Sequence, residues 1–293
     1  MAASGALTTE PGSVSAPVER DVTASGVRLR VVEHGTGQTV VFVHSLFMDH
    51  RTWDGVRAAM QGEFRIITPD LPGFGQSEKP APSRFPYGIN AFSEAIADLY
   101  AGLEIGRAAL VGHGLGGAIA LTLAARHPEL LSHLVLVDPW VYPGRMGLEL
   151  RLAHLPLISN LIFKQLVGRG WFRTYFRNRL ISPSASVDVQ RIDSFYEVFN
   201  SPAARGSALA TLSGCADTRS VEAQTTRIRT PTLVIWGSQD ELTSCRHGQR
   251  LAREIRGAGL ELIDTGHSPQ EERPTELAGL IRRFLRSPIP TFG

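Results

Sequence analysis

The sequence predicts an α/β fold, with a mostly parallel central sheet, helices on both faces and an inserted helical cap. Two observations lead to this prediction. From residue 21 onward, short apolar runs that end in Gly, Asp, Ser or His alternate with helix-like segments, and this alternation is typical of α/β sheets. The later apolar runs are almost uninterrupted, as in parallel strands that are covered on both faces.

The elements follow in chain order. Two alternating stretches flank Ser25 and Gly26, which predicts a hairpin. Further strands are predicted at residues 39–45, 64–70, 108–114, 133–139, 230–237 and 260–267. Apolar residues recur at helical spacing between and after these strands. The clearest helical segments are residues 89–103, 116–128 and 274–287.

The alternation lapses between about Trp140 and Val221, where aromatic and leucine residues recur at helical spacing. We therefore predict a helical cap inserted into one core domain. The predicted division is a flexible tail over residues 1–17, a core of residues 18–140 and 222–293, and a cap over residues 141–221. Basic residues dominate the first half of this cap, and a solvated face explains them better than an anionic ligand or a membrane surface. These residues are Arg145, Arg151, Lys164, Arg169, Arg173, Arg177 and Arg179, against Glu149.

Composition narrows the class of protein. A chain of 293 residues with 43% hydrophobic residues can bury an ample core, and a net charge of only +2 argues against a nucleic-acid partner. Cys215 and Cys245 cannot form a disulfide framework, so we predict a cytoplasmic location. No apolar run approaches the roughly 18 residues of a membrane span, and we expect no integral membrane segment. The first 20 residues lack the pattern of a signal peptide.

The stretch LVGHGLGG, residues 110–117, leads from an apolar strand through a glycine-rich turn into an alanine-rich helix. A sharp turn of this kind needs small neighbours, which Gly112, Gly116 and Gly117 provide. Many hydrolases present a nucleophilic serine at the apex of such a turn. Here the apex is Gly114, which tolerates the strained backbone but leaves the nucleophile position vacant.

Four other motifs accompany this turn in a fixed order: VFVHS, PDLPGFGQSEKP, VIWGSQDELT and DTGHSPQEERP. With them the chain resembles the α/β-hydrolase fold superfamily, in the branch with a cap domain, from about Pro17 to Phe284. The resemblance implies a small-molecule substrate, an acid at Asp240 and a base at His267. Asp138 is the rival acid, because some members of the superfamily place the acid after that strand.

The pair of Asp240 and His267, which we call the dyad, also makes chemical sense without the resemblance. A histidine beside a carboxylate is held in one tautomer, and the carboxylate stabilises the imidazolium that forms when the base takes a proton. The resemblance places the two backbone amides of an oxyanion hole at Leu46 and Leu115. Where the family usually has His-Gly, this chain has His44 and Ser45, and the Ser45 hydroxyl either binds a ligand or caps its loop.

We expect a helical cap rich in aromatic and leucine residues to close an apolar pocket over the dyad. We predict substrate-binding roles for Ser45, His44, His113 and Trp140. Trp53, Phe47 and Leu46 either line the same pocket or belong to the core.

Glycine cannot form an acyl-enzyme, so covalent catalysis at position 114 is excluded. Three hypotheses remain open. The dyad acts directly as a general base on a small apolar ester, lactone, thioester or dicarbonyl compound, in hydrolysis, elimination or cyclisation. Alternatively, the chain binds a small molecule without catalysis, or it is an ordinary serine hydrolase whose nucleophile has been substituted. We find no cofactor motif and no metal-ligand spacing among the histidines, and we make no prediction of the oligomeric state.

Overall fold

A computed structural model of the chain describes residues 16–142 and 167–287. Most of the predicted tail over residues 1–17, and residues 143–166 of the predicted cap, lie outside the described residues. The described core is built on one sheet of eight strands in the order β1-β2-β4-β3-β5-β6-β7-β8. The strands are β1 Val18–Ala24, β2 Val27–His34, β3 Gln38–Val43, β4 Phe64–Pro69, β5 Ala108–His113, β6 Leu131–Val137, β7 Thr232–Gly237 and β8 Gly259–Ile263.

The direction of the strands follows the prediction. The first two strands form the hairpin around Ser25 and Gly26, and β2 pairs antiparallel with β4. All pairs from β4 to β8 are parallel. Every residue of β5 and β7 is buried, as expected for central strands that helices cover on both faces. The carboxyl ends of β3, β5, β7 and β8 therefore meet at one edge of the sheet.

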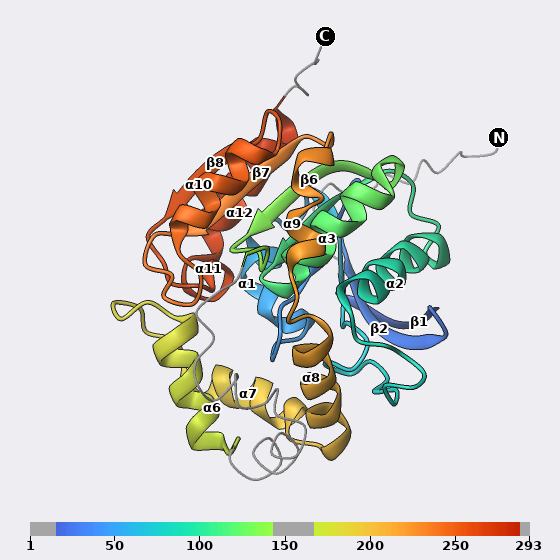
Figure 1. The fold of residues 1–293 in the computed structure, drawn as a ribbon, viewed down its shortest axis with the longest axis vertical. Helices are drawn as coiled ribbons and strands as arrows, with labels where there is room; N and C mark the ends of the chain where they lie inside the picture. Colours follow the sequence, from blue (N-terminus) through green and yellow to red (C-terminus); the bar gives the residue numbers. More distant parts are fainter. Residues whose placement is uncertain (1–15, 143–166, 288–293) are drawn as a thin grey trace, which may run out of the picture.

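Helices cover both faces of the sheet (Figure 1). The hydrophobic cluster on one face includes buried residues of α2 and α3, and the cluster on the other face includes buried residues of α1 and α12. These elements confirm the predicted α/β class. The helices are α1 Asp54–Ala59, α2 Ile89–Gly102, α3 Leu115–Arg126, α6 Arg169–Tyr175, α7 Val189–Phe199, α8 Pro202–Gly214, α9 Arg219–Glu222, α10 Cys245–Glu254, α11 Pro269–Glu272 and α12 Pro274–Arg286.

The elements that the structure describes between β6 and β7 are all helices. Helices α6, α7 and α8 lie together at one end of the molecule (Figure 1). They share a third hydrophobic cluster with Phe47 and Met48 of the loop after β3. Stacked and edge-on aromatic rings dominate this cluster, for example Phe172 against Phe199. We call α6, α7 and α8 the cap helices; the boundaries of the cap as a domain stay a prediction.

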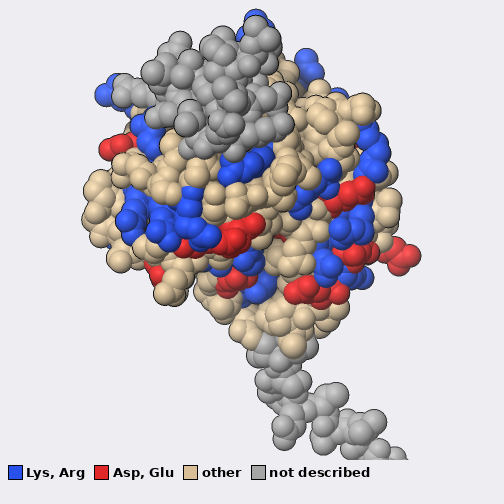
Figure 2. Space-filling model, turned by 90° about the horizontal axis from the view of Figure 1, so that it is seen from below, with Lys and Arg blue, Asp and Glu red and all other residues tan. Residues whose placement is uncertain are grey.

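Two of the predicted basic residues of the cap, Arg169 and Arg173, have acidic partners. Asp193 pairs with both Arg169 and Arg173, and Arg169 also pairs with Glu197. In Figure 2, basic and acidic side chains lie side by side on the face seen from below the cap helices. Arg145, Arg151 and Lys164 lie outside the described residues. Among the described helices, none combines the length and the apolar character needed to cross a bilayer.

Candidate active site

The turn between β5 and α3 has the shape that the glycine pattern predicts. Gly114 has φ +53° and ψ −113°, a conformation that side chains rarely tolerate. A Cβ on Gly112 would lie 2.8 Å from Gly117 Cα, and a Cβ on Gly116 would lie 2.7 Å from His44 O. Strand and helix therefore approach each other closely, and the apex at Gly114 offers no side-chain nucleophile.

Asp240 and His267 meet beside this turn. Asp240 Oδ2 lies 2.7 Å from His267 Nδ1, and both side chains are buried. The backbone amides of Leu242 and Thr243 donate to Asp240 Oδ1 at 2.7 and 2.8 Å, and the Thr243 hydroxyl donates to Oδ2 at 2.7 Å. Burial alone would raise the pKa of Asp240, but His267 and the Thr243 donors outweigh burial and hold this pKa below its usual value. The ionised carboxylate thus holds Nδ1, and Nε2 is left for chemistry.

Nε2 of His267 faces the vacant position. A Cβ built on Gly114 would lie 3.4 Å from His267 Nε2. A water molecule or a substrate atom in the pocket beside this position would be within reach of an imidazole nitrogen that can accept its proton. The arrangement is a histidine with a carboxylate behind it and, at residue 114 in front of it, no side chain.

Asp138, the rival acid, lies next to the dyad. Its Oδ1 accepts a hydrogen bond of 2.9 Å from Gly237 N. One carboxylate oxygen of Asp138, one of Asp240 and one ring nitrogen of His267 lie within 4.8 Å of one another. Asp138 is fully buried. Burial, and then the charge of Asp240, raise the pKa of Asp138 well above its usual value. Because Asp240 makes the hydrogen bond to His267 Nδ1, the geometry favours Asp240 as the acid. The raised pKa of Asp138 favours its protonated form.

Replacing Asp138 tests this protonation state. A raised pKa means that the folded protein holds a proton that the unfolded chain releases, so the free energy of unfolding falls as the pH rises above about 4. We expect Asp138→Asn to remove that fall, because the amide does not titrate. Asp138→Ala should lower the free energy of unfolding by about 1–3 kcal/mol, because Gly237 N loses its acceptor. Urea unfolding of the three proteins between about pH 4 and 8 measures both effects. An equal pH slope in the wild-type protein and in Asp138→Asn would contradict a protonated Asp138.

His113 supports the dyad from behind. Its Nε2 donates to His267 O at 2.7 Å, and its Nδ1 accepts from Gln270 Nε2 at 3.1 Å. Burial, and then His267, lower the pKa of His113 to about 3. The ring is thus neutral with both nitrogens engaged. It lines the pocket, as predicted for a substrate-binding residue, but its polar atoms serve the loop of His267.

His44 positions the loop after β3. Its Nδ1 donates to Ser45 O at 2.8 Å, and its Nε2 accepts from Leu71 N at 2.9 Å. Burial lowers its pKa, so the neutral ring can make both hydrogen bonds. His44 is not among the described residues that line the pocket. The structure therefore gives it an anchoring role beneath Ser45 in place of the predicted contact with substrate.

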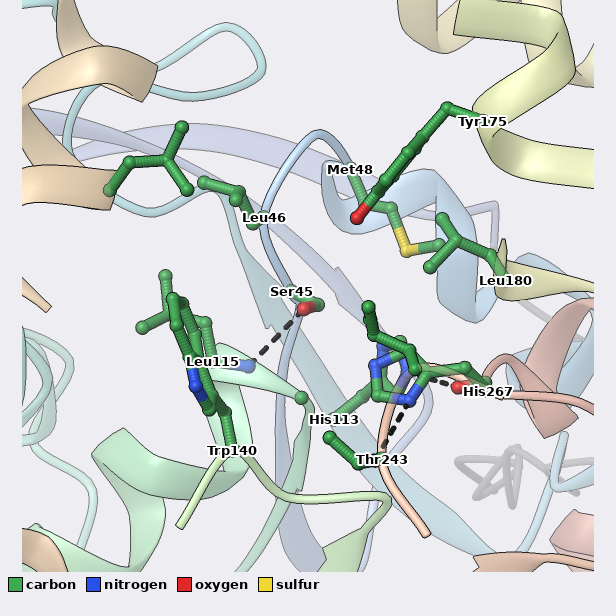
Figure 3. A pocket seen from close by; sticks show the side chains of 13 residues that line it. Ser45, Leu46, Met48, His113, Leu115, Trp140, Tyr175, Leu180, Thr243 and His267 are labelled. Carbon is green, nitrogen blue, oxygen red and sulfur yellow. Dashed lines mark hydrogen bonds between the residues drawn. The ribbon is translucent and has the colours of Figure 1, made fainter. Parts of the chain in front are cut away.

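The pocket in front of the dyad is apolar. Figure 3 shows His267, Ser45 and Trp140 around it, with Tyr175 and Leu180 reaching in from the cap side. Its empty space, including the mouth, is about 600 Å³. Among the described residues that line it, there is no Lys, Arg, Asp or Glu. These residues are Ser45, Leu46, Met48, His113, Gly114, Leu115, Trp140, Tyr175, Leu180, Leu212, Leu242, Thr243 and His267.

Two aromatic residues that were candidates for the pocket belong to the interior. Trp53 is fully buried on the face of α1 and α12, with its ring centroid 5.0 Å from that of Phe42. Phe47 packs edge-on against Phe172 and joins the cluster beneath the cap helices. Conversely, the sequence reasoning missed Tyr175, which comes from the cap. Helical periodicity marks such residues as buried but does not show which cavity they face.

Two groups of side chains could hold a metal ion by spacing alone. One group is Asp49, His50 and Asp70, and the other is Asp138, Asp240 and His267. In both groups the described carboxylates already accept protein hydrogen bonds. Asp70, for example, accepts from His50 N, His50 Nδ1 and Gln76 N at 2.7 to 2.8 Å. Hydrogen bonds within the protein therefore account for the burial of these carboxylates without a bound cation.

The segment after His267 ties the cap to the core. Glu271, on α11, pairs with Arg191 of α7 at 3.0 Å. The neighbouring Glu272 accepts from Ser182 N at 3.1 Å and, with the same oxygen, from Gly266 N at 2.8 Å. One carboxylate oxygen thus joins a residue between α6 and α7 to the residue that precedes His267.

Residues 40–280 match the Alpha/beta hydrolase family. The 2-hydroxymuconate semialdehyde hydrolase of Pseudomonas sp. (strain CF600) is 29% identical over 92% of this chain and 95% of its own length. The 2-hydroxy-6-oxo-2,4-heptadienoate hydrolase of Pseudomonas putida is 28% identical over 93% of this chain and 98% of its own. A thermophilic esterase from Thermogutta terrifontis is similar in structure, with a TM-score of 0.76 at 26% identity over 92% of this chain and 98% of its own.

Proposed function

Because the chain belongs to the alpha/beta hydrolase family, we propose that it acts on a small apolar carbonyl compound without forming a covalent bond to position 114. Asp240 and His267 form the catalytic dyad in this proposal, and His267 Nε2 is the general base. One observation carries it: His267 Nε2 would lie 3.4 Å from a Cβ on Gly114, so the base faces a residue that has no side-chain nucleophile.

The substrate class follows from the pocket. Its described lining is mainly Leu, with one Met and one Trp, and its polar side chains are Ser45, His113, Tyr175, Thr243 and His267. Such a lining favours a neutral ligand with an apolar body and one polar centre. An ester, a lactone, a thioester or a dicarbonyl compound has this form. Two relatives are named as hydrolases of compounds with an aldehyde or oxo group; both names also denote a carboxylate, so these relatives support the carbonyl centre and not the neutral charge.

In the reaction we propose, His267 Nε2 takes a proton from a water molecule in the pocket beside Gly114 and Ser45. The water oxygen bonds to the carbonyl carbon, and the electron pair of the C=O bond moves to the carbonyl oxygen. When the intermediate collapses, the leaving group receives the proton from His267. Asp240 stabilises the imidazolium that exists between the two transfers.

Three neutral probes test the proposal: p-nitrophenyl butyrate, delta-valerolactone and benzoylacetone. We expect steady turnover of at least one probe, a fall of about 10²–10⁴-fold in kcat/KM for Asp240→Asn, and an unmodified intact mass during turnover. Saturable binding of the probes without turnover would indicate a non-catalytic binding protein. An acyl adduct on the chain, or equal turnover by Asp240→Asn, would contradict the direct action of the dyad.

A further inference from the structure

The Ser45 hydroxyl occupies the space that the missing side chain at position 114 would fill. A Cβ built on Gly114 would overlap Ser45 Oγ and would lie 3.0 Å from Ser45 Cβ. Ser45 is more than nine-tenths buried and lines the pocket, and in Figure 3 its hydroxyl lies between Leu115 and His267. A polar group therefore stands beside the dyad, and it comes from the loop after the neighbouring strand β3.

The hydrogen bonding of Ser45 leaves its proton for a ligand. Leu115 N donates to Ser45 Oγ at 3.2 Å, and this amide is one of the two donors expected in the oxyanion hole. A serine hydroxyl carries one proton and two lone pairs, and within the part of the chain that the structure describes, no residue accepts that proton. The Leu115 amide is thus directed at Ser45 Oγ, and the hydroxyl proton is left for a ligand.

The loop holds this hydroxyl in place before any ligand arrives. Ser45 O accepts from His44 Nδ1 at 2.8 Å and from Met48 N at 3.4 Å. Phe47, two residues further on, has φ +63° and packs beneath the cap helices. A donor that needs no rearrangement stabilises developing charge better than one that must first be ordered.

We propose that the Ser45 hydroxyl binds the carbonyl oxygen of the substrate and stabilises the negative charge that develops on it. The Leu115 amide donates to Ser45 Oγ, and Oγ–H donates to the carbonyl oxygen, so the two donors act in series. The hydrogen bond from the Leu115 amide polarises the hydroxyl. This strengthens the hydrogen bond that the hydroxyl donates to the carbonyl oxygen. The inference rests on the proposed function, because it assigns a residue to the carbonyl chemistry of the same pocket. Ser45 would then be a catalytic residue.

Kinetics give the first test. With p-nitrophenyl butyrate, we expect Ser45→Ala to lower kcat by about 10²–10³-fold with a small change in KM, and Ser45→Thr, which keeps a hydroxyl, to retain most of the rate. Ser93→Ala is the matched control, because Ser93 is a fully buried serine on α2 that does not line the pocket. An unchanged or raised kcat in Ser45→Ala would overturn the inference. An acyl adduct mapped to Ser45 would also overturn it, because Ser45 would then be a nucleophile.

A second readout does not depend on turnover. Acetophenone is a neutral ketone that can be labelled with carbon-13 at its carbonyl, and a hydrogen bond to that oxygen lowers its infrared stretching frequency. We expect a lower frequency for acetophenone bound to the wild-type protein than for acetophenone bound to Ser45→Ala. Equal frequencies would overturn the role of Ser45 even if Asp240→Asn abolishes turnover. Turnover that is unaffected by Asp240→Asn would instead overturn the proposed function. An absence of saturable acetophenone binding would count against both the role of Ser45 and the proposed function.

Discussion

Replacing His267 with alanine is expected to lower kcat/KM by roughly 10²–10⁴-fold for any probe that the wild-type protein turns over. The reason is the geometry of the dyad: Asp240 holds Nδ1 at 2.7 Å, so Nε2 is the basic atom that faces the vacant position. The same probe, assayed with both proteins at a fixed pH, gives the ratio. Circular dichroism and urea unfolding show whether the variant remains folded.

The control for this experiment is His127→Ala. His127 follows the last turn of α3 and is half-buried beside Glu94, outside the described lining of the pocket. We expect the kcat/KM of His127→Ala to equal that of the wild-type protein. If His267→Ala and His127→Ala have the same kcat/KM, the general base is another group and the dyad has a structural role.

Introducing a serine at position 114 is expected to create a covalent site only when Ser45 is removed at the same time. In Gly114→Ser alone, the new Cβ would overlap Ser45 Oγ, so we expect the free energy of unfolding to fall by about 1–3 kcal/mol. In the double variant Ser45→Gly/Gly114→Ser, the space is free and the new hydroxyl lies in front of His267 Nε2. A fluorophosphonate should then add one label per chain, which intact mass detects.

Three comparisons make the result interpretable. The wild-type protein should gain no label, and the double variant with His267→Ala should lose the label, because its serine is no longer activated. Equal labelling of Gly114→Ser and the double variant would mean that the Ser45 side chain rotates away freely. If the folded double variant gains no label, His267 is not positioned to activate a nucleophile at the turn.

The sequence alone predicted the framework of the site well. The glycine pattern around position 114 predicted a sharp turn, because Gly112 and Gly116 leave room for a close approach of strand and helix. The order of the motifs predicted that Asp240 and His267 would meet, since the carboxyl ends of parallel strands lie along one edge. The catalytic roles of these two residues stay predictions that the variants above test.

Other features depend on distances that a linear pattern does not contain. Ser45 reaches the vacant position because β3 and β5 are neighbours and because one rotamer of its side chain points across the gap. Asp138 lies beside Asp240 because β6 and β7 pair in one particular register. Trp53, an alternative candidate for the pocket, lies in the core because the short 3-10 helix before α1, His50–Trp53, places its side chain in the cluster that α1 and α12 share.

The attachment of the cap through Glu272 links access to the pocket with the readiness of the base. The same carboxylate oxygen accepts from Ser182 N on the cap side and from Gly266 N, next to His267. A displacement of the cap that pulls Ser182 away also disturbs the acceptor that fixes the His267 loop. The placement of the cap and the placement of His267 thus depend on one carboxylate, so replacing Glu272 is expected to loosen both at once.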